Sequence, residues 1–164
     1  MLSSLILLSS LAIAGPRTEV GAGKDFGIGV EAGLYYSFTG KYFFSDNAGL
    51  AFSVGASPYG IGYTNGRVQF EGRVLEFADW DFADFGGYWN AGLASRIWLD
   101  SSITSSVQLG PTGGVGVELR FKEAPAAVYA ETDFRLWLVG PKTGTYAGIS
   151  QFGLAPLVGG RWYF

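Results

Sequence analysis

The side chains of this sequence that could do chemistry are charged residues placed at alternate positions within otherwise apolar or glycine-rich segments. In residues 67–77, for example, Glu71 and Arg73 alternate with Gly72 and Val74. Successive side chains of a β-strand point to opposite faces, so this spacing gathers the charges on one face. The set contains five acids and seven bases: Glu31, Lys41, Glu71, Arg73, Arg96, Glu118, Arg120, Lys122, Glu131, Asp133, Arg135 and Arg161.

Three kinds of chemistry are open to such a set. The first is a structural network of ion pairs, because an unpaired charge removed from water costs on the order of several kcal/mol. The second is the charged lining or gate of a small channel. The third is acid–base catalysis by neighbouring carboxylates such as Glu131 and Asp133. We favour the structural network, since no recognisable nucleophile or substrate cleft accompanies the carboxylates.

Enzymatic and metal-dependent functions have little support in the composition. The sequence has no histidine, the commonest general base and metal ligand, and no cysteine for disulfides or thiolate sites. Asp79, Asp81 and Asp84 are close enough in sequence to bind Ca²⁺, but their spacing is not that of an EF-hand, so we predict an acidic, solvated turn. Glycine-rich segments complete no dinucleotide- or phosphate-binding motif. We expect no catalytic residues, no metal and no cofactor.

The elements that must position the charges are short alternating segments. Eight of them are predicted as strands: residues 25–34, 36–45, 48–57, 67–77, 87–99, 112–122, 126–138 and 151–164. Turn-forming or polar connections separate them at 45–47, 58–66, 78–85, 100–111, 123–125 and 139–150. The segment 112–122 alternates most regularly, with Val115 and Val117 on one face and Glu118 and Arg120 on the other.

The composition of the two faces indicates which one points inward. The charged rows consist of glycine and isolated charges, whereas a soluble protein needs a densely polar surface. The 26 glycines leave room for long side chains in a narrow interior. Eight strands enclose an interior that side chains just fill, and closure removes the strand edges that hydrocarbon does not tolerate. The sequence therefore predicts an all-β, eight-stranded antiparallel up-and-down transmembrane β-barrel, with a soluble β-barrel as the alternative.

The two ends of the sequence carry their own signals. Residues 1–14 have an apolar core and a small-x-small pattern at Ala12 and Ala14, which predicts a signal peptide and a barrel domain at 15–164, although no basic residue precedes the core. The alternative is a buried N-terminal helix. The last segment ends in an apolar row that we interpret as the closing strand and assembly signal: Val158, Gly160, Trp162 and Phe164. All five tryptophans are expected at the membrane interfaces: Trp80, Trp89, Trp98, Trp137 and Trp162.

Four stretches carry a resemblance to a known family: GKYFFSDN at 40–47, GVGVELRFKEAP at 114–125, VYAE at 128–131 and GGRWYF at 159–164. The sequence resembles the small eight-stranded outer-membrane β-barrel proteins, similar in architecture to the OmpA and OmpX transmembrane barrels. The resemblance covers most of the barrel domain, and its motifs are structural rather than catalytic. It implies a Gram-negative outer membrane, with membrane lipid and the barrel-assembly machinery as partners.

The function expected from these observations is structural or surface-directed. The charged network plugs the lumen, and the connections 58–66, 100–111 and 139–150 contact partners, including a possible extracellular ligand. The alternative is a small passive channel with a charge-lined, gated lumen. Net charge is −3, which gives no basic footprint for nucleic acid. A monomer is expected.

Overall fold

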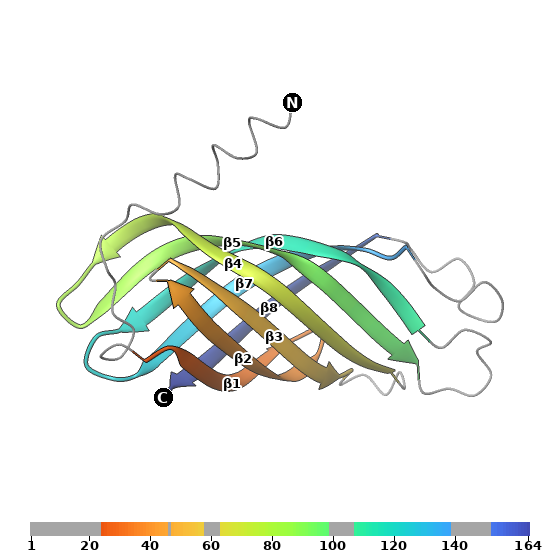
Figure 1. The fold of residues 1–164 in the computed structure, drawn as a ribbon, viewed down its shortest axis with the longest axis horizontal. Coiled ribbons are helices and arrows are strands. Elements are labelled where there is room, and N and C mark those ends of the chain that lie inside the picture. The colour runs from red at the N-terminus through yellow and green to blue at the C-terminus, as the bar shows by residue number, and fades with distance from the viewer. Residues whose placement is uncertain (1–23, 46, 58–62, 99–106, 139–151) are drawn as a thin grey trace, which may run out of the picture.

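The computed structural model describes residues 24–45, 47–57, 63–98, 107–138 and 152–164, and these form eight strands. In chain order the strands are β1 (Phe26–Gly33), β2 (Tyr36–Ser45), β3 (Ala48–Ala56), β4 (Tyr63–Asp79), β5 (Ala83–Trp98), β6 (Val107–Phe121), β7 (Ala126–Leu136) and β8 (Phe152–Tyr163). Each strand pairs antiparallel with the next, and β8 pairs with β1, so the sheet is a closed barrel (Figure 1). The predicted eight-stranded antiparallel barrel is confirmed.

The barrel closes at a seam between its first and last strands. Gly27 lies opposite Tyr163 and Gly33 opposite Leu157, and the backbone N–H of Phe164 donates to the carbonyl of Phe26 at 2.7 Å. The start of β1 and the end of β8 therefore lie at the same end of the barrel, which we call the turn end. Strands β2, β4 and β6 end and β3, β5 and β7 begin at this end, and the other ends of the strands lie at the opposite end, which we call the loop end (Figure 1).

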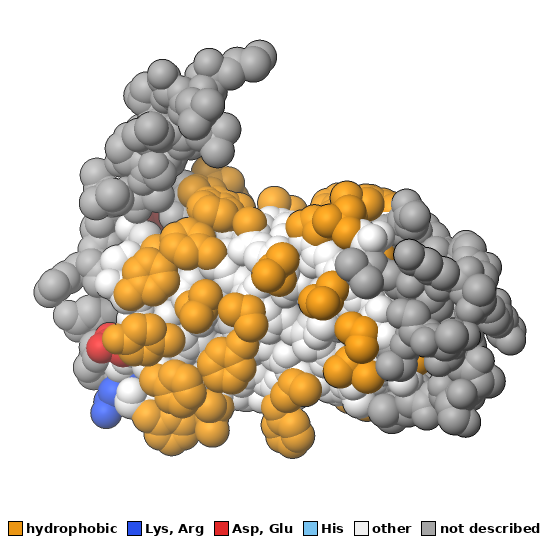
Figure 2. Space-filling view, turned by 45° about the vertical axis from the view of Figure 1, so that its right-hand side comes forward, with side chains coloured by type: hydrophobic (Ala, Val, Ile, Leu, Met, Phe, Trp, Pro, Cys, Tyr) orange, Lys and Arg blue, Asp and Glu red, His pale blue; other side chains and the backbone are white. Residues whose placement is uncertain are grey.

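The alternation along each strand separates an apolar outside from a polar inside. Phe38 is 75% exposed and Leu93 62% exposed on the outer wall, while Lys41 and Asn90 are buried inside. Figure 2 shows apolar side chains spread over the outside of the wall, with charged side chains visible mainly near one end. Among the residues that the structure describes, no helix has the length and apolar character needed to cross a membrane.

Glycines on the inward rows provide the space that the large side chains occupy. A Cβ added at Gly116 would collide with the Tyr88 ring, and one added at Gly159 would collide with the Tyr129 ring. The close approach of an aromatic ring to the opposing backbone is what requires glycine at these positions. The interior is thus filled by side chains packed against bare backbone, as expected for a barrel of eight strands.

Three predicted connections are too long, because strand pairing continues beyond the alternating segments. Strand β4 begins at Tyr63 and ends at Asp79, so the predicted loop 58–66 is shorter and the connection 78–85 shrinks to residues 80–82. Strand β6 begins at Val107 rather than after residue 111. Tyr63 on β4 pairs with Trp98 on β5, and Val107 on β6 pairs with Ile97 on β5. These pairings supply backbone hydrogen bonds that side-chain patterns do not reveal.

Other predictions fall outside the described residues. The signal peptide at 1–14 and its cleavage lie there, as do residues 58–62, 99–106 and 139–150 of the expected surface connections.

Candidate functional site: the charged interior

The inward charges gather into two clusters inside the barrel. We call the first the Arg67 cluster; it comprises Arg67, Glu31, Glu131, Asp133 and Arg135. We call the second the Lys41 cluster; it lies nearer the turn end and comprises Lys41, Glu71, Glu118, Arg120 and Arg161. All ten side chains are buried, with exposed fractions between 0% for Asp133 and 6% for Glu31.

Arg67 is the centre of the first cluster. Its Nη2 lies 2.7 Å from Oε2 of Glu31, its Nη1 lies 2.6 Å from Oδ2 of Asp133, and the same Nη1 donates to Glu131. Arg67 projects from β4, whereas its partners project from β1 and β7, each three strands away around the wall. The guanidinium therefore bridges the interior rather than pairing with a neighbour on the wall.

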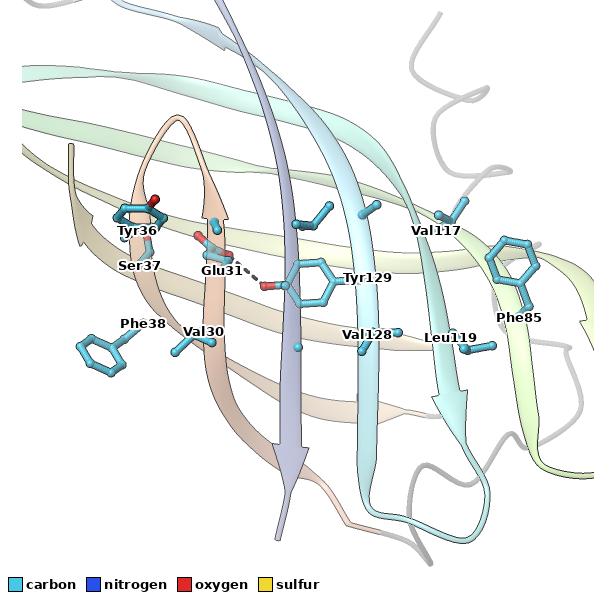
Figure 3. Close-up of a pocket in the computed structure, with 15 residues that line it drawn as sticks. Val30, Glu31, Tyr36, Ser37, Phe38, Phe85, Val117, Leu119, Val128 and Tyr129 are labelled. Atoms are coloured by element: carbon cyan, nitrogen blue, oxygen red, sulfur yellow. Dashed lines mark hydrogen bonds between the residues drawn. The ribbon is translucent and has the colours of Figure 1, made fainter. Parts of the chain in front are cut away.

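Each carboxylate of the Arg67 cluster also accepts a hydrogen bond from a neutral donor. The Tyr88 hydroxyl donates to Glu131, the Tyr129 hydroxyl donates to Glu31 at 2.9 Å, and Asn90 Nδ2 donates to Asp133 at 3.0 Å. Figure 3 shows the Tyr129 hydroxyl directed at Glu31. Buried charges are tolerated when they are both paired and hydrogen-bonded, which is the arrangement seen here.

The Lys41 cluster also reaches across the interior. Lys41 on β2 lies 2.6 Å from Glu71 on β4 and 3.2 Å from Glu118 on β6. Arg120 Nε lies 2.7 Å from Glu118, and Arg161 Nη2 lies 3.6 Å from Glu71. Lys41 is thus held between two carboxylates from different parts of the wall.

Tyr129 and Phe43 supply the aromatic contacts around this cluster. The Lys41 ammonium lies 4.6 Å from the centre of the Phe43 ring, and the Arg120 guanidinium lies 4.8 Å from the same centre. The Arg161 guanidinium lies 4.1 Å from the centre of the Tyr129 ring, within the range of a cation–π contact. Because Tyr129 also donates to Glu31, it joins the two clusters.

All the predicted inward residues except Lys122 are placed on the inner wall, and two of these, Arg73 and Arg96, lie outside both clusters. Arg73 is buried near the turn end, where its guanidinium occupies the space beside Gly86. Arg96 lies toward the loop end, donates from Nη2 to the Tyr35 hydroxyl at 2.7 Å, and lies 4.9 Å from the ring centre of Trp137.

The expectation that all five tryptophans form interfacial girdles is wrong for Trp98 and Trp137. Trp98 is 5% exposed and Trp137 4% exposed, and both stand on inward rows around Arg96. The guanidinium accounts for their position, since indole faces attract it. The other three tryptophans are on the outer wall: Trp80, Trp89 and Trp162.

Two charges near the turn end also differ from expectation. Lys122 follows the end of β6 and is partly exposed rather than inward; it donates to Asp79 and lies 3.7 Å from Asp84. The hydrogen bond from Lys122 to Asp79 raises the pKa of the lysine. Asp84 is 2% exposed, so it is not part of a solvated turn. Strand β5 begins at Ala83 and carries Asp84 into the ladder opposite Arg120, which explains the burial.

Arg67, the centre of the interior, is missing from the set of charges selected on the sequence. The signal was present, because Arg67 shares the parity of Glu71 and Arg73 on the same segment. Tyr88 has the parity of Arg96 on its segment and Tyr129 that of Glu131, which indicates an inward position. Their role as hydrogen-bond donors to buried carboxylates depends on contacts between strands that are distant in sequence.

The closing-strand row lies on the outer wall at the seam. Val158 is 59% exposed, Trp162 51% and Phe164 59%, while Gly160 is half-buried. Gly160 pairs with Val30 and Trp162 with Ile28 on β1. These residues therefore lie at the seam and face the outside of the barrel, and they do not point into the charged interior.

Two hollows of the described wall are apolar and are lined mainly by outer residues. One, of about 700 Å³, is lined chiefly by small or aliphatic outer residues, among them Ala130, Val158 and Gly160, with Phe38 at one side and Phe85 at another (Figure 3). No group of three or more metal-ligating side chains with suitable geometry occurs in the described part of the chain. In the Arg67 cluster the carboxylates face a guanidinium, so the charge that a metal would supply is already present.

Comparison with known proteins shows the fold. No family model matches the sequence, and no curated protein matches it. Among solved structures, the crystal structure of the N-terminal β-barrel domain of Pseudomonas aeruginosa OprF is similar, with a TM-score of 0.62 and 16% sequence identity over 85% of this chain and 96% of that one. The resemblance expected from the sequence is therefore confirmed at the level of the fold: the chain is similar to the OmpA-type eight-stranded barrels.

Proposed function

We propose that this chain is an outer-membrane β-barrel with a structural or surface-interaction role, whose lumen is closed by its two charged clusters. The observation that carries the proposal is the position of Arg67, whose guanidinium lies between carboxylates from β1 and β7. A side chain held in this way occupies the axis of a barrel that is already narrow.

The outer wall supports the membrane location. Val30 is 60% exposed and Phe38 75% exposed, on a face that continues around the closed sheet. An apolar face of this extent is unfavourable in water and favourable in hydrocarbon, while the inward charges are shielded from lipid. The fold shared with the OprF barrel domain is consistent with this location.

The contacts of the clusters support a closed lumen. A continuous water path requires the Arg67 contacts to β1 and β7 to separate, and also the Lys41 contacts to β4 and β6. Separating a desolvated ion pair without replacing its partners costs about 3–5 kcal/mol. Two such clusters, joined through Tyr129, keep an open state rare.

The loop end is where we place the surface role. Strands β3, β5 and β7 end there and β4, β6 and β8 begin there, opposite the end at which β1 begins and β8 ends. Loops on a rigid scaffold commonly carry recognition. The partners that we propose are membrane lipid, the barrel-assembly machinery and an extracellular ligand bound by the connections between these strands.

Conductance of refolded protein in planar bilayers tests the proposal. The wild type should give only small or infrequent conductance, and Lys41→Ala combined with Arg67→Ala should raise the open fraction. Lys122→Ala is the matched control, because it removes a positive charge outside the interior. A large, steady wild-type conductance would support the small passive channel instead. If the double variant conducts no more than the control, the clusters are not what closes the lumen.

A further inference from the structure

The hairpin at the turn end of β4 and β5 extends past its neighbour on one side. Pairing between β3 and β4 ends with Ala48 opposite Gly72, whereas pairing between β4 and β5 continues to Asp79 opposite Asp84. We call residues 74–85 the β4–β5 hairpin. In Figure 1 it projects beyond the point where β3 begins. The β4 side of this hairpin therefore has no described neighbouring strand of the barrel wall beside it.

One face of the β4–β5 hairpin is a cluster of aromatic rings. The ring centres of Phe77 and Phe85 are 5.3 Å apart, those of Trp80 and Phe85 are 6.2 Å apart, and those of Trp80 and Phe82 are 5.7 Å apart. Phe77 is 52% exposed, Trp80 44% and Phe82 56%. The rings touch one another but leave about half of their surface without a partner in the described residues.

The polar groups of the hairpin gather apart from these rings. Asp79 and Asp84 lie opposite each other in the ladder, and Lys122 from the end of β6 contacts both carboxylates. Asp84 is buried beneath the hairpin. The hairpin is therefore amphipathic, with an ion-paired side and an aromatic side.

The edge of β4 in this hairpin is poorly suited to bind a partner strand. On the side of β4 that faces β3, no described strand pairs with it beyond Arg73, whose N–H donates to the carbonyl of Asn47. The ladder with β5 is interrupted between Arg73 and Leu75 and again between Glu76 and Ala78. Bulges and charges on an edge are the usual means of preventing edge-to-edge pairing. We therefore expect a partner to cover the aromatic face of the hairpin rather than to pair with the backbone edge of β4.

The apolar outer wall also carries aromatic rings, as the aromatic face of the hairpin does. Nearer the middle of the barrel, the ring centres of Phe44 and Phe70 are 5.4 Å apart, and those of Phe70 and Trp89 are also 5.4 Å apart. The other two connections at the turn end, residues 46–47 and 122–125, have no aromatic residue. Among the three connections at this end, the aromatic face is thus confined to the β4–β5 hairpin, while Phe44, Trp162 and Phe164 are exposed on the strands of the outer wall and at the seam.

We propose that the β4–β5 hairpin is a one-sided membrane anchor, whose aromatic face lies in the boundary between phospholipid headgroups and acyl chains at the turn end. Aromatic rings are enriched at this depth, where an apolar body meets a polar boundary. The ion pair of Lys122 with Asp79 keeps the polar side neutralised close to the membrane. The inference rests on the membrane location proposed above, and it adds which part of the turn end is held against lipid.

Spin labels at single cysteines test the anchor, because the chain has no cysteine of its own. The variants Phe82→Cys, Glu123→Cys and Val30→Cys carry a nitroxide on refolded protein in vesicles of phosphatidylethanolamine and phosphatidylglycerol. Phe82 represents the aromatic face, Glu123 an exposed turn at the same end, and Val30 the outer wall. Collision with oxygen reports lipid, and collision with a water-soluble nickel chelate reports water. Heat-modifiable migration on gels verifies that each variant is folded.

We expect the label at residue 82 to have an oxygen-to-nickel collision ratio several-fold above that at residue 123 and closer to that at residue 30. Equal ratios at residues 82 and 123, with residue 30 in lipid, would overturn the anchor and leave the aromatic face to a water-soluble partner. A water-exposed label at residue 30 would overturn the membrane location itself, and the anchor with it.

Discussion

The guanidinium of Arg67 on β4 donates to the carboxylate of Glu131 on β7, across the interior of the barrel and between residues that are 64 positions apart in the chain. Glu31 on β1 and Asp133 on β7 contact the same guanidinium. Three negative groups therefore contact one cation that is 4% exposed, and Asp133 has in addition Arg135 at 3.4 Å. The consequences of removing that cation are larger than those of removing a charge at the surface.

Arg67→Met should lower the free energy of unfolding by about 3–5 kcal/mol, because it leaves buried carboxylates without their cation. Urea unfolding of refolded protein in vesicles, followed by tryptophan fluorescence, measures the change. Adding Glu131→Gln to Arg67→Met should cost less than the sum of the single changes, since the two residues are in contact. Strict additivity would show that the pair does not interact as the structure indicates.

Two glycines on β8, of which one is crowded by a side chain and the other is not, allow the effect of packing on stability to be compared. A Cβ at Gly159 would lie 2.9 Å from Cε1 of Tyr129 and closer still to other atoms of that side chain, whereas at Gly153 the nearest atom is Nε1 of Trp137 at 3.9 Å. Gly159→Ala should therefore destabilise the barrel by about 1–3 kcal/mol through overpacking, and Gly153→Ala should have little effect. Thermal unfolding in detergent micelles compares them. Equal losses would contradict the proposed role of Gly159 as space for Tyr129.

The facing of the strands could be predicted because it depends only on alternation. Val115 and Glu118 are on opposite faces in the sequence pattern and in the structure. The same rule holds for Tyr129, which has the parity of Glu131 and is buried with it. Strand ends were harder, because the pairing of Tyr63 with Trp98 depends on a partner strand that the local sequence does not specify. Bulges add to this difficulty, as between Arg73 and Leu75, where the alternation itself shifts.

The members of each cluster could not be predicted, for a different physical reason. Alternation shows that Lys41 and Glu118 are both inward, but their 3.2 Å contact depends on the register of all the strands between β2 and β6. For Trp98, the alternation indicated the correct face, but the type of side chain led to a wrong prediction. Its large aromatic side chain suggested an interface, yet it has the same parity as Arg96 and lies inside with it.

Deletion of residues 162–164 should sharply reduce the amount of folded barrel in the outer-membrane fraction. These residues close the seam: Trp162 lies opposite Ile28, Tyr163 opposite Gly27, and the N–H of Phe164 bonds to Phe26. Heat-modifiable protein on gels measures the folded fraction. Phe164→Leu is the control, because it keeps the backbone and an apolar terminus. Unchanged recovery of the truncated chain would show that closure does not need the end of β8.

The pKa of Lys122 depends on its contact with Asp79 at the turn end. Its hydrogen bond to Asp79 stabilises the charged ammonium and raises the lysine pKa above its ordinary value. A group whose pKa is raised by folding contributes stability below its unfolded pKa, and that contribution is lost as pH rises through the folded pKa. The pair should therefore hold the hairpin at neutral pH and be lost in strongly alkaline solution. It is also lost in acid, when Asp79, whose pKa is lowered by the same hydrogen bond, takes up a proton.

Titration of isotopically labelled lysine side chains by NMR in micelles tests this assignment. Asp79→Asn should return the pKa of Lys122 toward its ordinary value, because it removes the carboxylate that accepts the hydrogen bond. Asp81→Asn makes the same change in charge two positions away, at a side chain that forms no ion pair with the lysine, and should leave the pKa nearly where it is in the wild type. If both variants lower the pKa equally, the general negative charge of the hairpin, rather than the bond to Asp79, sets the value.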